Sequence, residues 1–182
     1  MSLLLFRNDN TIEKMENNLL NAVVEKLKTK FGDGLVTAEQ HYDFPVFTLK
    51  REIIYDALQF LKEDEELGFT FLTTMCGLHY PDNKGKELGV MYQLHNLPKN
   101  NRIRLKTFFS ISDPTVPTIT TLFPTANWME RQEYDFFGII FKGHPNLKRI
   151  LNMDEMDYFP MRKEYQLEDA TREDKDDKMF GR

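Results

Sequence analysis

The chain has 182 residues, with 24 basic and 29 acidic side chains, a formal net charge of −5 and a hydrophobic share of 41%. This length and composition predict one folded domain with extensions rather than a disordered chain. The negative net charge argues against nucleic acid as a partner, because such proteins usually present a net basic face. No run approaches the ~18 apolar residues that span a bilayer, so direct membrane insertion is not expected.

The first third of the chain predicts two helices that flank a pair of strands. A capping pattern at Asn10 and apolar residues at helical spacing predict a helix that ends at Gly32. Strands are expected at residues 35–40 and 44–50. Residues 52–62 predict a second helix, because their apolar side chains fall on one face.

From Phe69 the hydrophobic pattern changes to period two. Strands are expected at residues 69–73, 88–95 and 102–107, joined by turns that contain Pro81 and Pro98. Strict alternation indicates a sheet with one buried and one open face. Strands joined by short turns predict an antiparallel meander that two helices can cover. The expected fold class is therefore α+β, a two-layer, mostly antiparallel sheet covered by helices, with an extended C-terminal arm.

The last third predicts a short strand near Ile119, a helix at residues 125–137 that Gly138 stops, and a short strand at residues 139–141. The expected domain organisation is a single α+β domain at 1–145, an extended partner-binding arm at 146–167 and a flexible charged tail at 168–182. The tail holds six acids and four bases among few apolar groups, a composition typical of mobile chain ends.

Catalytic and metal sites find little support in the sequence. The single cysteine, Cys76, forms a lone C-x-x-H pattern with His79, whereas a zinc or iron–sulfur site needs four ligands, usually with repeated short spacings. The same pair also lacks a glycine-rich nucleophile turn. The carboxylates of Glu130, Glu133 and Asp135 could serve acid–base chemistry, but Asp135 stands four residues after an arginine. That spacing predicts an ordinary Arg131–Asp135 ion pair on the surface of a helix.

Protein-binding features are more numerous. The stretch from Trp128 to Tyr165 combines aromatic residues with charges of both signs, as the centres of protein interfaces do. Three further cations alternate along one predicted strand, at Arg102, Arg104 and Lys106. This row is either a solvated face or a contact for an acidic protein partner.

One long block of the sequence resembles a known family. Phe123-Pro124, Trp128, Glu130-Arg131, Tyr134-Asp135, Phe137-Gly138-Ile139, Gly143-His144-Pro145 and Leu147-Lys148-Arg149 resemble the signature of the C subunit, the 30 kDa chain, of respiratory complex I. The closing run Pro160-Met161-Arg162-Lys163-Glu164-Tyr165 is similar to the end motif of that family. The resemblance covers roughly residues 69–165. Departures from the family pattern occur at His79, Gln132, Glu133, Tyr158, Glu164 and Gln166.

The resemblance implies a non-catalytic subunit in the hydrophilic arm of a proton-translocating NADH-quinone oxidoreductase, at its quinone-reducing module. Its partners would be the D subunit (49 kDa-type) and the B subunit of the complex, on the cytoplasmic side of the inner membrane, although the chain alone could be soluble. NAD, FMN, iron–sulfur clusters and quinone would belong to other chains of the complex. The residues expected at the partner interface are Trp128, Arg131, Asp135, His144, Pro145, Lys148, Arg149, Arg162, Lys163 and Tyr165.

Two other functions are compatible with the sequence. The same module occurs in membrane-bound hydrogenases and in ferredoxin- or F420-type dehydrogenase complexes, which this sequence cannot easily distinguish. A free-standing enzyme that uses Cys76 and His79 is the alternative from a different functional class.

Overall fold

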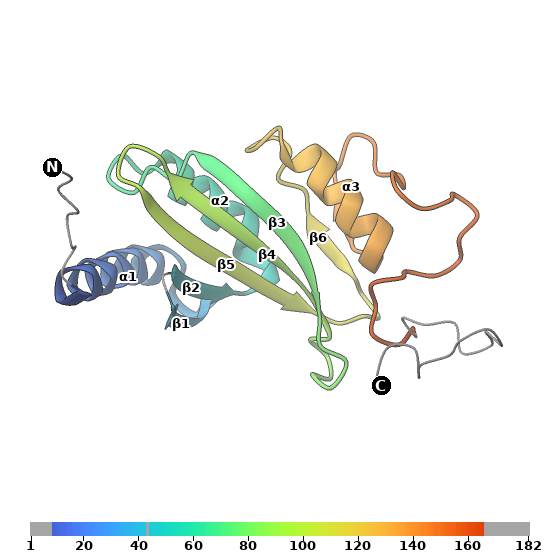
Figure 1. Cartoon of the computed structure of the whole chain (residues 1–182), viewed down its shortest axis with the longest axis horizontal. Helices are drawn as coiled ribbons and strands as arrows, with labels where there is room; N and C mark the ends of the chain where they lie inside the picture. Colours follow the sequence, from blue (N-terminus) through green and yellow to red (C-terminus); the bar gives the residue numbers. More distant parts are fainter. Residues whose placement is uncertain (1–8, 43, 166–182) are drawn as a thin grey trace, which may run out of the picture.

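A five-stranded sheet forms the main layer of the protein (Figure 1). The computed structural model describes residues 9–42 and 44–165, with side chains from residue 19 onward. In chain order the helices and strands are α1 (Asp9–Phe31), the 3-10 turn η1 (Gly32–Gly34), β1 (Leu35–His41), β2 (Phe44–Leu49), the 3-10 turn η2 (Arg51–Ile53), α2 (Ile54–Glu63), β3 (Phe71–His79), β4 (Leu88–Asn96), β5 (Asn101–Phe109), β6 (Thr115–Pro117), α3 (Ala126–Phe137) and β7 (Ile140–Lys142).

The α+β fold class is confirmed, and the sheet is mixed rather than a pure meander. Its strand order is β1-β2-β5-β4-β3. The pairs β1/β2, β3/β4 and β4/β5 are antiparallel, as predicted, but β2 lies parallel to β5. This parallel pair has a physical reason: α2 connects the hairpin to the later strands, and a helical crossover can return the chain in the same direction.

The core lies on one face of the sheet. Strand β4 places Leu88, Val90, Tyr92 and Leu94 on this face, and all four are fully buried. Three helices contribute to the same core, with buried side chains that include Leu27 from α1, Leu58 from α2 and Phe137 from α3. In Figure 1, α2 lies behind the sheet and α3 lies beside β3.

Strand β3 is longer than the sequence predicts. The predicted strand stops at Thr73, whereas the observed strand continues through Cys76 to His79. A register irregularity between Leu72 and Thr74 interrupts the alternation on which the prediction rests. Gly77, in the second half, has no side chain because α3 lies directly above it. A Cβ there would come within 2.5 Å of the Phe137 ring.

The C-terminal third follows a short second sheet. Strand β6 pairs in parallel with β7, and α3 connects them. The predicted strand near Ile119 therefore lies slightly earlier, at β6. Residues 143–165 contain neither helix nor strand, and the tail predicted at 168–182 lies outside the described residues. Within the described ranges, no helix combines the length and apolar character that a membrane crossing requires.

Candidate functional site

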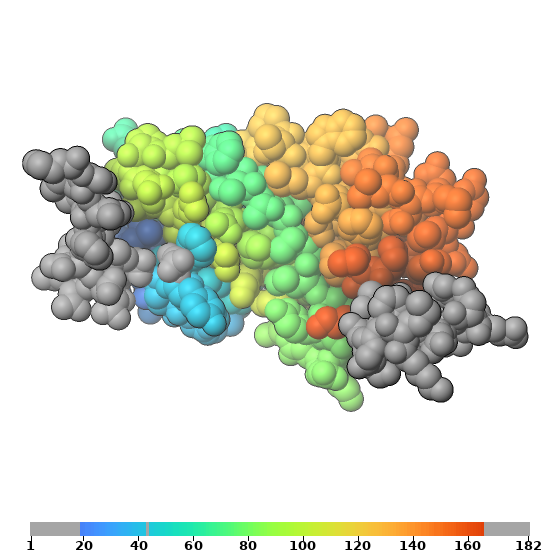
Figure 2. Space-filling model, viewed as in Figure 1, coloured from blue at the N-terminus to red at the C-terminus, as the bar shows by residue number. Residues whose placement is uncertain are grey.

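Exposed apolar side chains gather on α3 and on the irregular C-terminal segment, residues 144–165. Trp128 is 64% exposed and Met153 is 70% exposed. We refer to six exposed side chains of this region as the docking surface: Trp128, Leu151, Met153, Tyr158, Met161 and Tyr165. Figure 2 shows the region in orange at one end of the molecule. Large apolar side chains that remain exposed beside charged groups are common at sites that bind another protein.

Asp135 anchors the first part of the C-terminal segment to α3. Its side chain is fully buried, and its carboxylate accepts the backbone N–H groups of Ile150 (3.0 Å), Leu151 (2.7 Å) and Asn152 (3.0 Å). Burial alone would raise the pKa of Asp135, but the hydrogen bonds from Asn152, Leu151 and Ile150 lower it well below its ordinary value. The carboxylate is therefore charged, and its hydrogen bonds are made to groups of the same chain.

Arg149 completes this anchor. Its Nη1 lies 2.9 Å from Asp135 Oδ1, and its Nη2 donates to the carbonyl oxygens of Met156 (2.8 Å) and Tyr158 (3.1 Å). The Arg149 side chain is only 9% exposed. One guanidinium thus joins α3 to two later turns of the C-terminal segment, through both of its terminal nitrogens.

Phe159 forms the second anchor. Its ring lies against Gly138, where a Cβ would come within 2.5 Å of ring carbons. The guanidinium groups of Arg149 and Arg162 lie 5.1 Å and 4.6 Å from the ring centroid, and Tyr134 meets the ring edge-on at 6.4 Å. Gly138 also ends α3 in the left-handed conformation, at φ +72°. The same glycine therefore stops the helix and admits the ring.

His79 holds the end of the C-terminal segment at the edge of the sheet. Its Nδ1 accepts the backbone N–H of Lys163 at 2.9 Å, and burial lowers its pKa below the ordinary value. Arg162 Nε donates to the Phe137 carbonyl oxygen at 2.7 Å, and Lys163 Nζ lies 5.5 Å from the centroid of the Tyr80 ring. The segment is thus fixed at both ends.

The other end of α3 presents exposed groups. The Arg131 guanidinium lies 4.8 Å from the Trp128 ring centroid, and its Nε donates to the Lys148 carbonyl oxygen at 3.3 Å. His144 accepts the Asn146 N–H on Nδ1, so its Nε2 carries the proton that faces the Asn127 carbonyl oxygen at 3.1 Å. These contacts hold the exposed Trp128 and Lys148 in defined positions.

Two buried carboxylates fix α3 to the rest of the domain. Glu130 accepts the Thr118 hydroxyl (2.5 Å) and the Ile119 N–H (2.7 Å), and Glu133 accepts the Gly77 N–H (2.6 Å). Burial raises the pKa of each carboxyl to about 7. Both acids therefore position the helix and are not part of its solvent face.

The predicted Arg131–Asp135 ion pair is wrong. Asp135 lies on the buried side of α3 and pairs with Arg149, fourteen residues later, while Arg131 stacks on Trp128. Residue spacing within the helix could not predict the Asp135–Arg149 pair, because Arg149 comes from the irregular segment that follows the helix.

The ten residues predicted at the interface fall into two groups. Asp135, Arg149 and Arg162 make contacts inside the chain and have side chains at most 13% exposed. The other seven are partly or fully exposed: Trp128, Arg131, His144, Pro145, Lys148, Lys163 and Tyr165. The sequence interpretation did not assign a role to Phe159, the ring around which the second anchor is built. The one sequence feature related to this role is Gly138, against which the Phe159 ring packs. The sequence alone does not reveal that contact.

The structure does not assemble the alternative Cys76–His79 site. Cys76 pairs in register with Met91 on the open face, whereas His79 pairs with Leu88 on the core face. Burial and the nearby Glu133 carboxylate raise the pKa of the Cys76 thiol. Among the side chains that the structure describes, at residues 19–42 and 44–165, no group of three or more His, Cys, Asp or Glu is placed to hold a metal.

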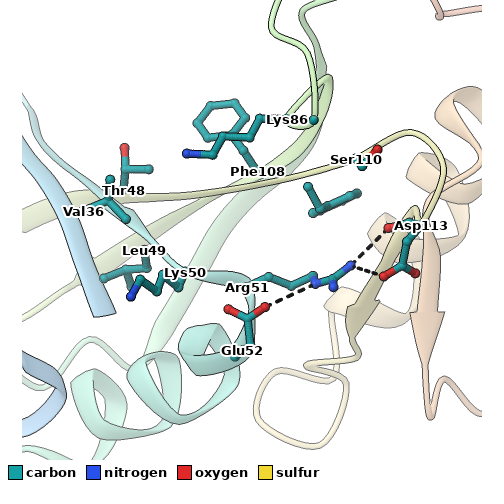
Figure 3. Close-up of a pocket in the computed structure, with 12 residues that line it drawn as sticks. Val36, Thr48, Leu49, Lys50, Arg51, Glu52, Lys86, Phe108, Ser110 and Asp113 are labelled. Atoms are coloured by element: carbon teal, nitrogen blue, oxygen red, sulfur yellow. Dashed lines mark hydrogen bonds and ion pairs between the residues drawn. The ribbon is translucent and has the colours of Figure 1, made fainter. Parts of the chain in front are cut away.

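A hollow of about 520 Å³ lies at the C-terminal end of β5, beside Phe108 and Ser110 (Figure 3). Arg51 crosses it, with Nη1 2.7 Å from Asp113 Oδ2 and Nε 3.8 Å from Glu52 Oε1. The hollow therefore contains an internal ion pair between η2 and the loop before β6, and its remaining cations, Lys50 and Lys86, come from exposed positions.

The sequence matches one protein family over residues 47–171, described as "Respiratory-chain NADH dehydrogenase, 30 Kd subunit". The chain is 46% identical to the C subunit of the NADH-quinone oxidoreductase of Nocardioides sp. over 121 residues, which are 66% of this chain and 48% of the relative. It is 35% identical to the C subunit from Mycobacteroides abscessus over 159 residues, 87% of this chain and 68% of the relative. The chain spans about half to two thirds of the length of these curated relatives.

Two solved structures share the fold. A trypsin-resistant fragment of Nqo5 is 33% identical, with a TM-score of 0.61, over 70% of this chain and 98% of that fragment. A chain of the membrane-bound sulfane sulfur reductase, an archaeal respiratory membrane complex, is 21% identical, with a TM-score of 0.67, over 81% of this chain and 85% of that chain. At that identity the second likeness concerns the fold alone.

Proposed function

Since the chain belongs to the 30 kDa subunit family of the respiratory-chain NADH dehydrogenase, we propose that it is a non-catalytic docking subunit of an NADH-quinone oxidoreductase. In this role it holds neighbouring hydrophilic chains together while they transfer electrons from NADH to quinone. It would sit at the periphery of the complex, on the cytoplasmic side of the membrane.

The observation that carries the proposal is the construction of the C-terminal segment. Asp135, Arg149 and Phe159 fix its backbone to α3, while its apolar side chains, such as Met153 and Leu151, remain outside. A preorganised segment loses little conformational entropy when a partner covers it. The exposed aromatic and arginine groups beside it are the residue types enriched at interface hot spots.

The proposed partners are the D subunit (49 kDa-type) and the B subunit of the complex, and the docking surface would lie against them. The NAD, FMN, iron–sulfur clusters and quinone would belong to those and other chains. The interface would include the seven exposed residues of the predicted set, and Asp135, Arg149 and Arg162 would act through the conformation that they impose on the segment.

Co-purification from membranes solubilised in mild detergent tests the proposal. We expect an affinity-tagged wild-type chain to recover the D and B subunits. A Leu151→Ser, Met153→Ser variant should recover at least about tenfold less of both subunits, because the loss of two apolar contacts with the partner costs more than about 1.4 kcal/mol of binding free energy.

A matched control separates docking from general surface effects. Val36 and Tyr42 are exposed apolar residues at the distant β1–β2 hairpin, so a Val36→Ser, Tyr42→Ser variant should recover partners like the wild type. Equal recovery by both double variants, or recovery of the wild-type chain without any other chain of complex I, would contradict the proposal.

A second candidate role is the equivalent subunit of a different respiratory membrane complex, such as a hydrogenase or a ferredoxin- or F420-type dehydrogenase. The observation that favours it is the fold shared with a chain of the sulfane sulfur reductase complex. The electron donor oxidised by the co-purified complex distinguishes the two roles. NADH oxidation coupled to quinone reduction supports the first, whereas recovery of a nickel-binding large subunit supports the second.

A further inference from the structure

No described helix covers the face of the sheet opposite the core, which we call the open face. All three helices contribute to the core on the other face, and in Figure 2 the strands between residues 70 and 106 lie directly at the surface, in green and yellow-green. The register places Cys76, Met91 and Lys106 side by side across β3, β4 and β5 on this open face, and all three are partly exposed.

A row of cations runs along β5 in the middle of the open face. Arg102, Arg104 and Lys106 alternate with the buried Ile103 and Leu105. Since a strand rises roughly 3.3 Å per residue, the three cations project from the sheet about 6.6 Å apart. This repeat equals the distance between alternate side chains of an extended chain lying along the strand.

These cations have no counter-charge within the chain as described. Among the described side chains, those of residues 19–42 and 44–165, no carboxylate forms an ion pair with any of the three. On the same face, the edge strand β1 carries Glu39, in register with Val46 and through it with Arg104, but Glu39 Oε2 pairs with His41 Nε2 at 2.7 Å. In a chain of net charge −5, three adjacent cations that pair with none of the described carboxylates are an unusual local excess of positive charge.

The central cation is held in place. Arg104 Nε donates to Gln93 Oε1 at 3.1 Å, and the guanidinium lies 4.7 Å from the centroid of the Phe44 ring. Both contacts restrict the side chain, so less rotamer entropy is lost when a carboxylate binds its remaining N–H groups. The surroundings are partly apolar, with Met91, Leu78 and Phe108 half-buried nearby on the same face.

We propose that the open face of the sheet is a second docking surface, which binds an acidic segment of a partner protein in extended conformation. Alternate carboxylates of that segment would meet Arg102, Arg104 and Lys106, and its other side chains would contact Met91 and Phe44. The inference does not depend on the proposed subunit role, since it uses strands β2 to β5 and none of the residues of the first docking surface.

Fluorescence anisotropy on the full chain tests the proposal with a labelled ten-residue peptide of alternating glutamate and threonine. The variant R102Q/R104Q/K106Q should bind this peptide at least about tenfold more weakly, because three charge contacts of about 0.5 kcal/mol each add to roughly 1.4 kcal/mol. The control variant K28Q/K50Q/K84Q removes the same charge from exposed lysines elsewhere and should change affinity by less than about twofold. Equal losses in both variants would overturn the proposal.

Cys76 reports where the peptide binds, because it is the single cysteine of the sequence and lies in register with Lys106 through Met91. Saturating peptide should slow its alkylation by iodoacetamide at least about threefold, whereas an unchanged rate would place the peptide elsewhere and contradict the proposal. Urea unfolding of the triple variant verifies its fold, and the single variant R102Q, at an exposed position, serves if the triple variant does not fold.

Two further experiments test whether nucleic acid or the chain's own end binds the open face instead. A single-stranded DNA oligonucleotide of equal charge that binds more tightly than the peptide would assign the face to nucleic acid instead. Neutralising four acids of the chain end, E173Q/D174N/D176N/D177N, should leave peptide affinity unchanged. A gain of about tenfold would instead identify the chain's own tail as the occupant.

Discussion

The five-stranded sheet and the C-terminal segment are stabilised in opposite ways. The sheet buries apolar side chains such as Leu58, Leu94 and Leu105 completely, so its stability comes mainly from area removed from water. The C-terminal segment leaves Leu151 and Met153 in water and is held by a carboxylate, two guanidinium groups and backbone N–H groups.

From this contrast we expect the segment to unfold as a separate cooperative unit. Few of its apolar side chains are buried, and most of its contacts converge on Asp135, Arg149 and Phe159, so it should open at a lower free energy than the sheet. A unit of this kind presents an ordered surface to a partner without contributing much to the stability of the domain that carries it.

Replacing Asp135 by Asn should have the largest effect on the attachment of the C-terminal segment. The variant leaves Arg149 buried without its counter-charge, which costs about 3 to 5 kcal/mol in comparable buried pairs. The expected result is rapid trypsin cleavage after Lys148, Arg149, Arg162 and Lys163, while the sheet stays intact. Peptide mapping by mass spectrometry checks the cleavage sites. An Asp157→Asn control alters an exposed acid of the same segment and should leave the digestion rate unchanged, and cleavage inside β3–β5 of the Asp135 variant would show that the two regions are not separable.

Glu133 tests how α3, the element shared by both regions, depends on pH. Its folded-state pKa is about 7 against an ordinary 4.5, so the folded state binds more protons between these values. Its stability contribution is fully present below pH 4.5 and is lost as the pH rises through 7. The Glu133→Gln variant should therefore lose less stability than the wild type between about pH 5 and 8, by up to about 3 kcal/mol.

Urea unfolding at about pH 5, 6.5 and 8 measures this slope. Glu155→Gln, at an exposed position, is the control and should keep the wild-type slope. If the stability of Glu133→Gln depends on pH as steeply as that of the wild type, ionisation of Glu133 does not destabilise the folded protein.

Gly138 connects the two regions, because it ends α3 and receives the Phe159 ring. Alanine there would combine an unfavourable positive φ with a Cβ that collides with the ring, and should cost about 1 to 3 kcal/mol. Gly85 has a similar φ of +79° but no atom within 4 Å of an added Cβ, so Gly85→Ala isolates the backbone cost. Thermal unfolding of both variants gives the difference, and equal losses would mean that Phe159 adds nothing to the attachment.

Sequence patterns predicted the sheet region better than the C-terminal segment, for physical reasons. The bounds of α1, α2, β4 and β5 follow from apolar periodicity, which reports local contact with a single core. The parallel β2/β5 pair and the second half of β3 depend on contacts between distant residues, so no local pattern reveals them.

The sequence indicated where exposed aromatic and charged groups lie, but not how they contact one another. Aromatic and charged composition predicted a protein-binding region between Trp128 and Tyr165, and exposed apolar side chains are observed in this stretch. Composition could not separate Arg131, which is partly exposed, from Arg149, whose side chain is only 9% exposed, because their roles depend on which side of α3 each one meets. The assignment of these residues to a partner interface stays a prediction.

That pair of arginines provides the smallest expected effect on stability and the clearest test of the division between attachment and docking. Arg131→Gln should lower the free energy of unfolding by less than about 0.5 kcal/mol, since it removes one exposed cation–π contact and one long hydrogen bond. Arg149→Gln should cost at least about 2 kcal/mol, because it removes the counter-charge of the buried Asp135 and leaves the Met156 and Tyr158 carbonyl oxygens without their donor. Urea unfolding compares the two, and co-purification should show reduced partner recovery for Arg131→Gln despite its near-native stability. If Arg131→Gln instead unfolds as readily as Arg149→Gln, the Trp128 end of α3 belongs to the attachment rather than to the docking surface.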